Sequence, residues 1–292
     1  MVLVTDEKAS VDVAVVIPAY MPDRRFFHEL LCCLQAQTAT PREICIVDDG
    51  SREPVEVPRT LLPIRLIRQD NAGISGARNR GVLETSASIV HILDQDELLE
   101  PDFYESLLPA FDDPRVDVSF SAMRLVQSDG TPTPYRFPEA SRQPPADWLA
   151  ALIREDVVVG SSAALFRRSL WNELGGFLPY RFVQDWRFWL DAASRCQFAY
   201  CERELAYHRR HSAQRTDAAR EVEALLEGVA MLGDVQLSMR YRAGRMRARA
   251  KLRLKAADKL PPGSRRLILS VTSFPVAPRS SIAVARGPGP MR

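Results

Sequence analysis

The sequence predicts an α/β fold, with a mostly parallel central sheet flanked by helices and a C-terminal helical extension. Short apolar, β-branched runs alternate with segments of helical period over the first hundred residues, as in parallel sheets. Several runs end in polar residues, and ligands of such sheets gather at the carboxyl ends of the strands. Of the 292 residues 46% are hydrophobic and 26% charged, which is typical of a globular protein with a sizeable core.

Four strands and two helices are predicted in the first part of the chain. The strands are short buried runs and the helices carry apolar residues at helical spacing. In chain order we expect a strand at 13–17, a helix at 26–37, strands at 44–47 and 64–67, a loop and helix over 71–86, and a strand at 89–93.

The second part is less regular. It is predicted to hold a strand at 116–126, a Pro-rich surface loop at 132–145, a short helix at 148–154, strands at 157–159 and 163–166, and helices at 185–195 and 217–239. A disordered end is expected over 279–292. We expect three parts: residues 1–115 and 116–215, each binding one of two substrates, and a helical basic extension with a disordered tail, 216–292.

Charge is distributed unevenly along the chain. Residues 1–239 hold 25 Lys and Arg against 36 Asp and Glu, whereas residues 240–292 hold 14 basic residues and one acid. A basic end of this kind suits an anionic membrane surface, or it forms a solvated basic helix. No nucleic-acid-binding motif accompanies the charge, so nucleic acid is not expected as a partner.

The N-terminus lacks an apolar signal region and no run reaches the ~20 apolar residues of a spanning helix. The five cysteines have no metal-type spacing and are expected to be reduced thiols. We therefore expect a cytoplasmic protein, peripheral at the inner face of the membrane if the basic end binds there.

Two carboxylates follow the predicted strand at 89–93. Asp94 and Asp96 stand where the chain turns out of the sheet. Such oxygen ligands suit Mg²⁺ or Mn²⁺, which bind one or two carboxylates together with substrate phosphates. A solvated acidic turn is the alternative for an Asp-x-Asp sequence alone, but the position after a buried strand favours the metal.

Two further polar segments are predicted at the same edge of the sheet. Asp48 and Asp49 follow the strand at 44–47 and suit either a turn or recognition of the N3–H of a uracil or thymine ring. Residues 71–79 form a Gly-containing loop that enters a helix, where Arg78 would add a bidentate donor to a phosphate site.

In order and rough spacing, these segments resemble the motifs of the family 2 glycosyltransferases. The matching motifs are Pro18-Ala19-Tyr20, Val47-Asp48-Asp49-Gly50-Ser51, Asn71-x-Gly73, Ala77-Arg78-Asn79, Asp94-Gln95-Asp96, Ser161-Ser162, Leu165-Phe166-Arg167-Arg168, Gly175-Gly176-Phe177, Gln184-Asp185-Trp186 and Tyr207-His208-Arg209-Arg210-His211. The resemblance covers about residues 13–215. It implies a GT-A fold and an inverting transfer from a UDP- or dTDP-sugar to the hydroxyl of a glycan, lipid-linked or small-molecule acceptor.

On the donor side the resemblance implies that Tyr20, two residues after Pro18, lies against the base and that Asp49 reads it. Arg78 is expected to contact the base or the diphosphate.

For the metal, the resemblance implies that Asp96 is the principal ligand of Mn²⁺ or Mg²⁺ and that Asp94 lies nearer the ribose and sugar. His211 is a candidate third ligand or a diphosphate contact; a solvated surface histidine is the alternative.

On the acceptor side the resemblance implies that Asp185 is the catalytic base. Ser161 and Trp186 would contact the acceptor, and Trp186 would stack on a sugar. Arg209 would clamp the diphosphate of the donor.

Three residues depart from the family pattern. Met21 stands where Asn is usual, Glu97 follows the Asp-x-Asp pair, and Gln184 replaces the first acid of a Glu-Asp pair. The alternative function is therefore a catalytically impaired protein that binds a nucleotide-sugar. A nucleotidyltransferase would need an N-terminal Gly-rich loop that is missing here.

Overall fold

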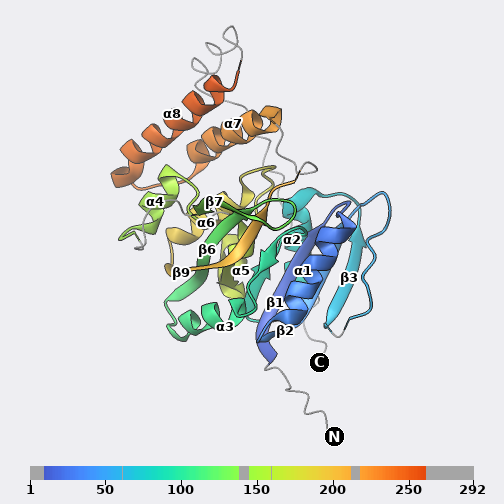
Figure 1. The fold of residues 1–292 in the computed structure, drawn as a ribbon. Helices are drawn as coiled ribbons and strands as arrows, with labels where there is room; N and C mark the ends of the chain where they lie inside the picture. The colour runs from blue at the N-terminus through green and yellow to red at the C-terminus, as the bar shows by residue number, and fades with distance from the viewer. Residues whose placement is uncertain (1–9, 61, 138–144, 159, 212–217, 261–292) are drawn as a thin grey trace, which may run out of the picture.

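The computed structural model describes residues 10–60, 62–137, 145–158, 160–211 and 218–260. These residues form one nine-stranded sheet with helices packed against it (Figure 1). The strands are β1 (Ser10–Ala19), β2 (Thr40–Asp49), β3 (Ile64–Gln69), β4 (Ile89–Ile92), β5 (Leu98–Leu99), β6 (Val116–Val126), β7 (Pro132–Phe137), β8 (Ala164–Arg167) and β9 (Gln197–Arg209).

The helices alternate with the strands, and the last two follow the sheet. They are α1 (Arg24–Ala36), α2 (Gly73–Leu83), α3 (Phe103–Leu107), α4 (Trp148–Arg154), α5 (Arg168–Leu174), α6 (Gln184–Ala193), α7 (Ala218–Asp234) and α8 (Arg242–Asp258), with 3₁₀ turns η1 (Leu108–Asp112), η2 (Ser161–Ala163) and η3 (Met239–Tyr241). The predicted α/β fold with a C-terminal helical part is confirmed.

The first four strands are parallel, as predicted. β1 pairs with β2 on one side and β4 on the other, and β2 pairs with β3. Residues 13–17 of β1 have no solvent exposure, because a strand in the middle of a parallel sheet is covered on both faces. The carboxyl ends of β1, β2 and β4 therefore lie at the same edge.

The second half of the sheet is largely antiparallel, which makes the whole sheet mixed rather than mostly parallel. β8 pairs antiparallel with both β4 and β6, and thereby joins the two halves. β6 pairs in parallel with the long strand β9. Strand direction depends on the path of the connecting segments, which the apolar runs do not encode.

Two expectations for this half were wrong, and one strand was missed. Residues 132–137 of the expected surface loop form β7, which pairs with β6; residues 138–144 lie outside the described ranges. Residues 157–158 form no strand. The strand β9 was missed, because it is half exposed and carries charged residues such as Glu202 and Arg203, so it lacks a continuous apolar run.

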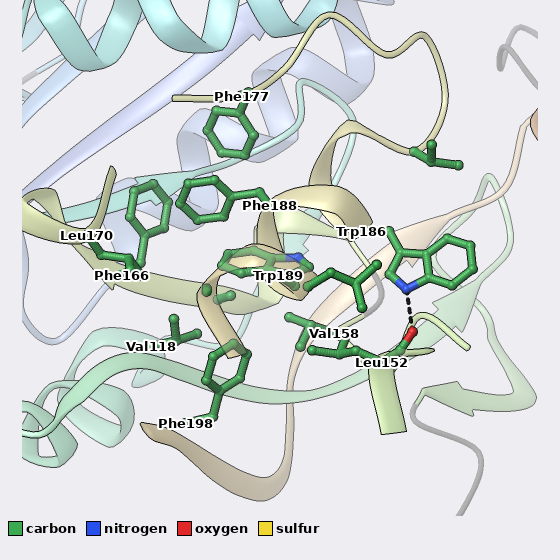
Figure 2. Close-up of a cluster of buried hydrophobic side chains, with 14 of the residues drawn as sticks. Val118, Leu152, Val158, Phe166, Leu170, Phe177, Trp186, Phe188, Trp189 and Phe198 are labelled. Atoms are coloured by element: carbon green, nitrogen blue, oxygen red, sulfur yellow. Dashed lines mark hydrogen bonds between the residues drawn. The ribbon is translucent and has the colours of Figure 1, made fainter. Parts of the chain in front are cut away.

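Hydrophobic clusters cover the two faces of the sheet. One lies beneath α1 and α3, and the other lies among α4, α5 and α6. Figure 2 shows the second cluster, where the fully buried Trp189 packs beside Phe166 and Phe188. The rings of Phe177 and Phe188 stack with centroids 4.6 Å apart. This cluster anchors α6, which bears the candidate base.

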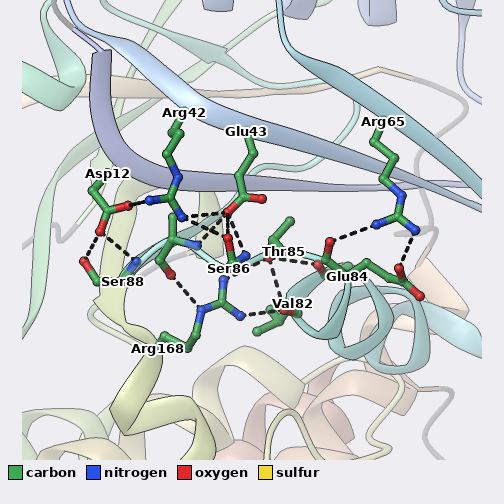
Figure 3. Close-up of polar contacts among 12 residues, drawn as sticks. Asp12, Arg42, Glu43, Arg65, Val82, Glu84, Thr85, Ser86, Ser88 and Arg168 are labelled. Carbon is green, nitrogen blue, oxygen red and sulfur yellow. Dashed lines mark hydrogen bonds and ion pairs between the residues drawn. The ribbon is translucent and has the colours of Figure 1, made fainter. Parts of the chain in front are cut away.

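Polar contacts fix the turn from α2 into β4 (Figure 3). Glu43 accepts hydrogen bonds from the backbone N–H groups of Ser86 and Ala87, at 2.7 and 2.5 Å. Arg168, the first residue of α5, donates to the carbonyl oxygens of Ala87 and Val82, both at 2.6 Å. These bonds join β2 and α5 to the backbone of this turn and so fix its course.

Helices α7 and α8 pack against each other, and α8 also packs against α4. No helix in the described part of the chain is long and apolar enough to cross a membrane. All five cysteines are unpaired thiols. One of them, Cys32, is exposed. The end expected to be disordered, 279–292, lies outside the described ranges.

Candidate active site

The polar ends of three parallel strands meet at one edge of the sheet. Ala19 of β1 lies opposite Asp48 of β2, and β4 runs beside β1 into Asp94. Tyr20, Asp49 and Asp94 therefore come from separate parts of the sequence to the same edge. This is the convergence that the polar strand ends predicted.

The guanidinium of Arg78 occupies the centre of the site. Arg78 is 1% exposed, and its Nη2 donates to Oδ1 of Asp94 at 2.9 Å. Its Nη1 lies 4.0 Å from Oδ2 of Asp185. A buried cation requires such partners, so Arg78 joins the Asp-x-Asp segment of one half to the candidate base of the other.

Asp185 lies in the first turn of α6, and its side chain is 15% exposed. Burial raises the pKa of Asp185; the Arg78 cation opposes that rise, and the Asp94 carboxylate adds to it. The backbone N–H of Trp186 donates to Oδ1 at 2.8 Å. A carboxyl group with a raised pKa is suited to accept a proton near neutral pH.

The segment before α6 is held against α2. Oδ1 of Asn79 accepts from the N–H of Phe177 at 2.8 Å, and Nδ2 donates to its carbonyl oxygen at 2.9 Å. Gly176 has φ +83°, and a Cβ there would lie 2.7 Å from Oδ1 of Asn79. The Gly175-Gly176-Phe177 motif is thus needed for close contact with α2.

Asp48 and Asp49 differ in what they hold. Asp48 accepts hydrogen bonds from the backbone N–H groups of Ser51 and Val55. Burial raises the pKa of Asp48, but these hydrogen bonds outweigh burial and keep the pKa below its ordinary value. Asp48 therefore has the turn role. Oδ1 of Asp49 accepts from Gln69 and from the N–H of Ala72, at 2.7 and 2.8 Å, which fixes the loop that enters α2.

Tyr20 is 48% exposed at the rim of the site, where its ring is accessible to a base. Pro18 is buried within β1 and lies opposite Val47. Met21 has φ 45° and donates its N–H to Oγ of Ser51 at 2.9 Å. This left-handed conformation is one that Asn adopts more readily than Met, which gives a physical reason for the usual Asn.

Asp96 and His211 form the candidate metal-binding pair. Oδ2 of Asp96 lies 2.8 Å from Nε2 of His211, whereas Asp94 is bound to Arg78. Among the described residues no group of three or more His, Cys, Asp or Glu side chains could hold a metal. A carboxylate beside an imidazole fits an ion that takes its remaining ligands from substrate phosphates and water.

Arg209 and Trp186 are placed differently from what we expected. Arg209 is 1% exposed, and its nitrogens donate to the backbone oxygens of Asp96 and Ser128 and to Glu29; it supports the Asp96 turn, and its contact with a diphosphate stays a prediction. Trp186 is 6% exposed, and its indole N–H donates to the carbonyl oxygen of Leu152 (Figure 2). Its ring is buried in the core, so the prediction that it stacks on a sugar is wrong.

Ser161 and Ser162 lie buried in η2. Oγ of Ser161 has no hydrogen-bond partner among the residues that the structure describes, and its contact with an acceptor stays a prediction. Oγ of Ser162 accepts from the N–H of Asp94 at 3.0 Å, and the carbonyl oxygen of Ser162 lies 2.9 Å from Nε2 of His91. Burial lowers the pKa of His91 to about 4, so this histidine is neutral and holds η2 to β4.

Sequence reasoning missed His91 and three further titratable residues near the site. The signal for His91 was a single histidine inside an apolar strand. Nδ1 of His208 lies 2.5 Å from Oε1 of Glu97. Burial lowers the pKa of His208, but attraction to the Glu97 carboxylate outweighs burial and raises this pKa to about 9. Burial and the Asp185 carboxylate raise the pKa of Asp156. Glu97 and His208 were noted only as positions in or beside motifs, with no role of their own, and no local motif marks Asp156.

Replacing Arg78 tests the central ion pairing. In Arg78→Gln the pKa of Asp185 rises further above its unfolded value, so stability is lost as pH rises from about 4 through that pKa. We expect the fall in Tm relative to the wild type to be larger at pH 8 than at pH 5. Arg80→Gln, which removes an exposed pair with Glu84 on the same helix, is the control and should show no such difference.

Residues 14–175 match the family model of glycosyl transferase family 2. A relative, the uncharacterized glycosyltransferase YwdF of Bacillus subtilis (strain 168), is 31% identical over 175 residues, which are 56% of this chain and 62% of YwdF. The match thus spans less than two thirds of that relative.

Two solved structures share the fold. TarS 1–349 of S. aureus in complex with UDP has a TM-score of 0.57 and 16% identity, over 88% of this chain and 78% of that one. The mannosyltransferase PcManGT of Pyrobaculum calidifontis, in complex with GDP-Man and Mn²⁺, has a TM-score of 0.56 and 17% identity, over 88% and 73%. Because the family match covers more than half of its length, the chain belongs to glycosyl transferase family 2 and has that family's GT-A type α/β fold.

Proposed function

We propose that the protein is an inverting, metal-dependent glycosyltransferase that moves a sugar from a UDP- or dTDP-sugar to an acceptor hydroxyl. The acceptor is a glycan, lipid-linked or small molecule in polysaccharide or glycoconjugate biosynthesis. The observation that carries the proposal is the contact of one buried guanidinium, Arg78, with both Asp94 and Asp185. Two carboxylates, one just after β4 and one in the first turn of α6, thus lie around one cation, which supports a donor-side role for Asp94 and a base role for Asp185.

Inversion requires a single in-line displacement at the anomeric carbon. The acceptor oxygen forms a bond to that carbon while the bond to the diphosphate oxygen breaks, and Asp185 takes the proton of the acceptor hydroxyl. Its raised pKa favours proton transfer. The Arg78 cation opposes the effect of burial on the pKa of Asp185 and thus favours the ionised carboxylate, the form that accepts a proton.

Asp96 and His211 would hold Mn²⁺ or Mg²⁺, with Asp94 beside them. When bound, the ion neutralises negative charge on the leaving diphosphate. Arg209 donates to the backbone oxygen of Asp96 at 3.1 Å and so keeps this carboxylate at the edge of the sheet. On the nucleotide side, Tyr20 supplies an exposed ring and Asp49 lies in the adjoining loop.

A thermal-shift panel tests donor binding. UDP, dTDP, GDP and CMP are each added with and without Mn²⁺ to the wild type and to Asp96→Ala. We expect a metal-dependent rise in Tm with UDP or dTDP that disappears in the variant, since a ligand at 100 times its Kd adds about 2.7 kcal/mol. Asp113→Ala, at an exposed site, should keep the shift. An unchanged shift in Asp96→Ala would contradict the metal assignment.

Replacing Asp185 separates the enzyme from an impaired binding protein. Asp185→Asn removes the base but keeps a side chain of the same size, so release of nucleotide and transfer should fall by about 10²- to 10⁴-fold while nucleotide binding is retained. Asp191→Asn, on the same helix and paired with Arg187, should keep activity. If the wild type binds nucleotide and turns over no faster than Asp185→Asn, the impaired protein is the correct function.

We also propose that α8 meets an anionic membrane surface. Its exposed side carries an apolar row, Ala243, Met246, Ala250 and Leu254, of which Met246 is 63% and Leu254 55% exposed. Basic residues flank this row on both sides, among them Arg242, Arg247 and Lys255. An apolar row between cations is typical of helices that lie in the membrane interface.

Sedimentation with vesicles tests the membrane proposal. The full chain should pellet with vesicles of phosphatidylcholine and phosphatidylglycerol and stay in solution with phosphatidylcholine alone. The double variant Met246→Glu, Leu254→Glu should lower the pelleted fraction several-fold. Leu66→Glu, which changes an exposed apolar residue of β3, is the control; equal pelleting of the double variant and the wild type would refute the proposal.

A further inference from the structure

Helix α6 begins without a capping side chain of its own. Its N-cap residue is Val183, which makes no side-chain cap hydrogen bond. The backbone N–H groups at and before a helix start require acceptors from elsewhere. In this chain the acceptor comes from α7, more than forty residues later in the sequence.

Glu227 of α7 accepts three backbone hydrogen bonds from the segment that leads into α6. Its Oε1 accepts from the N–H of Arg181 at 2.8 Å. Its Oε2 accepts from the N–H groups of Phe182 and Val183, at 2.6 and 3.2 Å. One carboxylate thus fixes three consecutive residues, and its negative charge lies near the positive end of the helix dipole.

The same segment is held from its other end by α2. Asn79 forms two hydrogen bonds with the backbone of Phe177. Oγ of Ser75 donates to the carbonyl oxygen of Leu178 at 2.8 Å. Residues 177–183 therefore run from α2, which carries Arg78, to α7, and they end two residues before Asp185.

The close approach of α7 to α6 leaves only tight space for a side chain next to Glu227. A Cβ on Gly228 would lie 3.2 Å from Cζ3 of Trp186 and 3.2 Å from Cδ1 of Leu252. Trp186 is the residue after Asp185, and its indole is bound to α4 through Leu152. Packing and hydrogen bonds together set the first turn of α6 against the C-terminal helices.

We propose that Glu227 is a positioning residue for the base Asp185, and that α7 is therefore part of the catalytic unit. The carboxylate fixes residues 181–183, so that α6 starts at Gln184 and presents Asp185 to Arg78. This inference rests on the function proposed for Asp185. The family match ends at residue 175, so it does not carry this role.

The test compares Glu227→Gln with Glu223→Gln in the full chain. The Gln side chain keeps its length but brings an NH₂ group toward N–H donors, which removes the charge and at least one bond. Glu223 lies one turn away and pairs with the side chain of Arg181 at 3.0 Å; within the described part of the chain its carboxylate accepts no backbone hydrogen bond. Each protein is assayed for hydrogen exchange, for Kd of UDP with Mn²⁺, and for UDP release from UDP-N-acetylglucosamine, UDP-glucose and UDP-galactose.

In Glu227→Gln we expect faster exchange at amides 181–183 and unchanged exchange in α2. The kcat for UDP release should fall about 10- to 100-fold, as for a base displaced by about 1 Å, while KM for the donor and Kd for UDP stay within twofold. Glu223→Gln should resemble the wild type. Glu227→Asp, which keeps the charge on a shorter side chain, should have an intermediate kcat and gives the same test if the Gln variant does not fold.

Two results would overturn the inference. One is wild-type exchange and kcat in the Glu227 variants; the other is a parallel loss of kcat and donor affinity, which indicates damage to the whole site. Failure of the proposed function looks different, because the wild type and Asp185→Asn would then release UDP at the same rate. In that case hydrogen exchange still decides whether Glu227 fixes the turn, and a lack of catalytic effect rejects its role toward a base.

Discussion

The buried cation of Arg78 is the constraint on which the site depends. A guanidinium that is 1% exposed costs several kcal/mol unless carboxylates compensate it. Its two partners are Asp94, which follows β4, and Asp185 of α6, and they belong to different halves of the chain. The halves must therefore be docked closely, and β8 supports this by pairing with strands of both.

Helix α6, which bears the candidate base Asp185, receives its position from neighbours rather than from its own sequence. Asn79 of α2 and Glu227 of α7 bind the segment before it, and Trp189 anchors its other face in the core. A base must be held to within a fraction of an ångström to act in a displacement. Glu227 of α7 contacts the segment that leads to the candidate base, as such positioning would require.

Several polar residues of the motifs support the site instead of facing a ligand. Asp48 closes a turn, Ser162 holds the N–H of Asp94, and Arg209 binds the backbone of Asp96. The more accessible side chains are few, Tyr20 among them. Some motif residues are thus accessible to a ligand, whereas others hold the backbone that positions the accessible groups.

Local sequence determined the four parallel strands, the helices with apolar stripes and the convergence of polar strand ends, because each depends on residues close together in the chain. Tertiary structure alone decided strand direction in the second half, the strand β9, the burial of Trp186 and the pairing of Glu227 with the start of α6. These features depend on contacts between distant residues, and a side chain such as Glu227 carries no local sign of the backbone N–H groups that it will meet. The polar pattern could therefore place the site, whereas the support of its base required the folded chain.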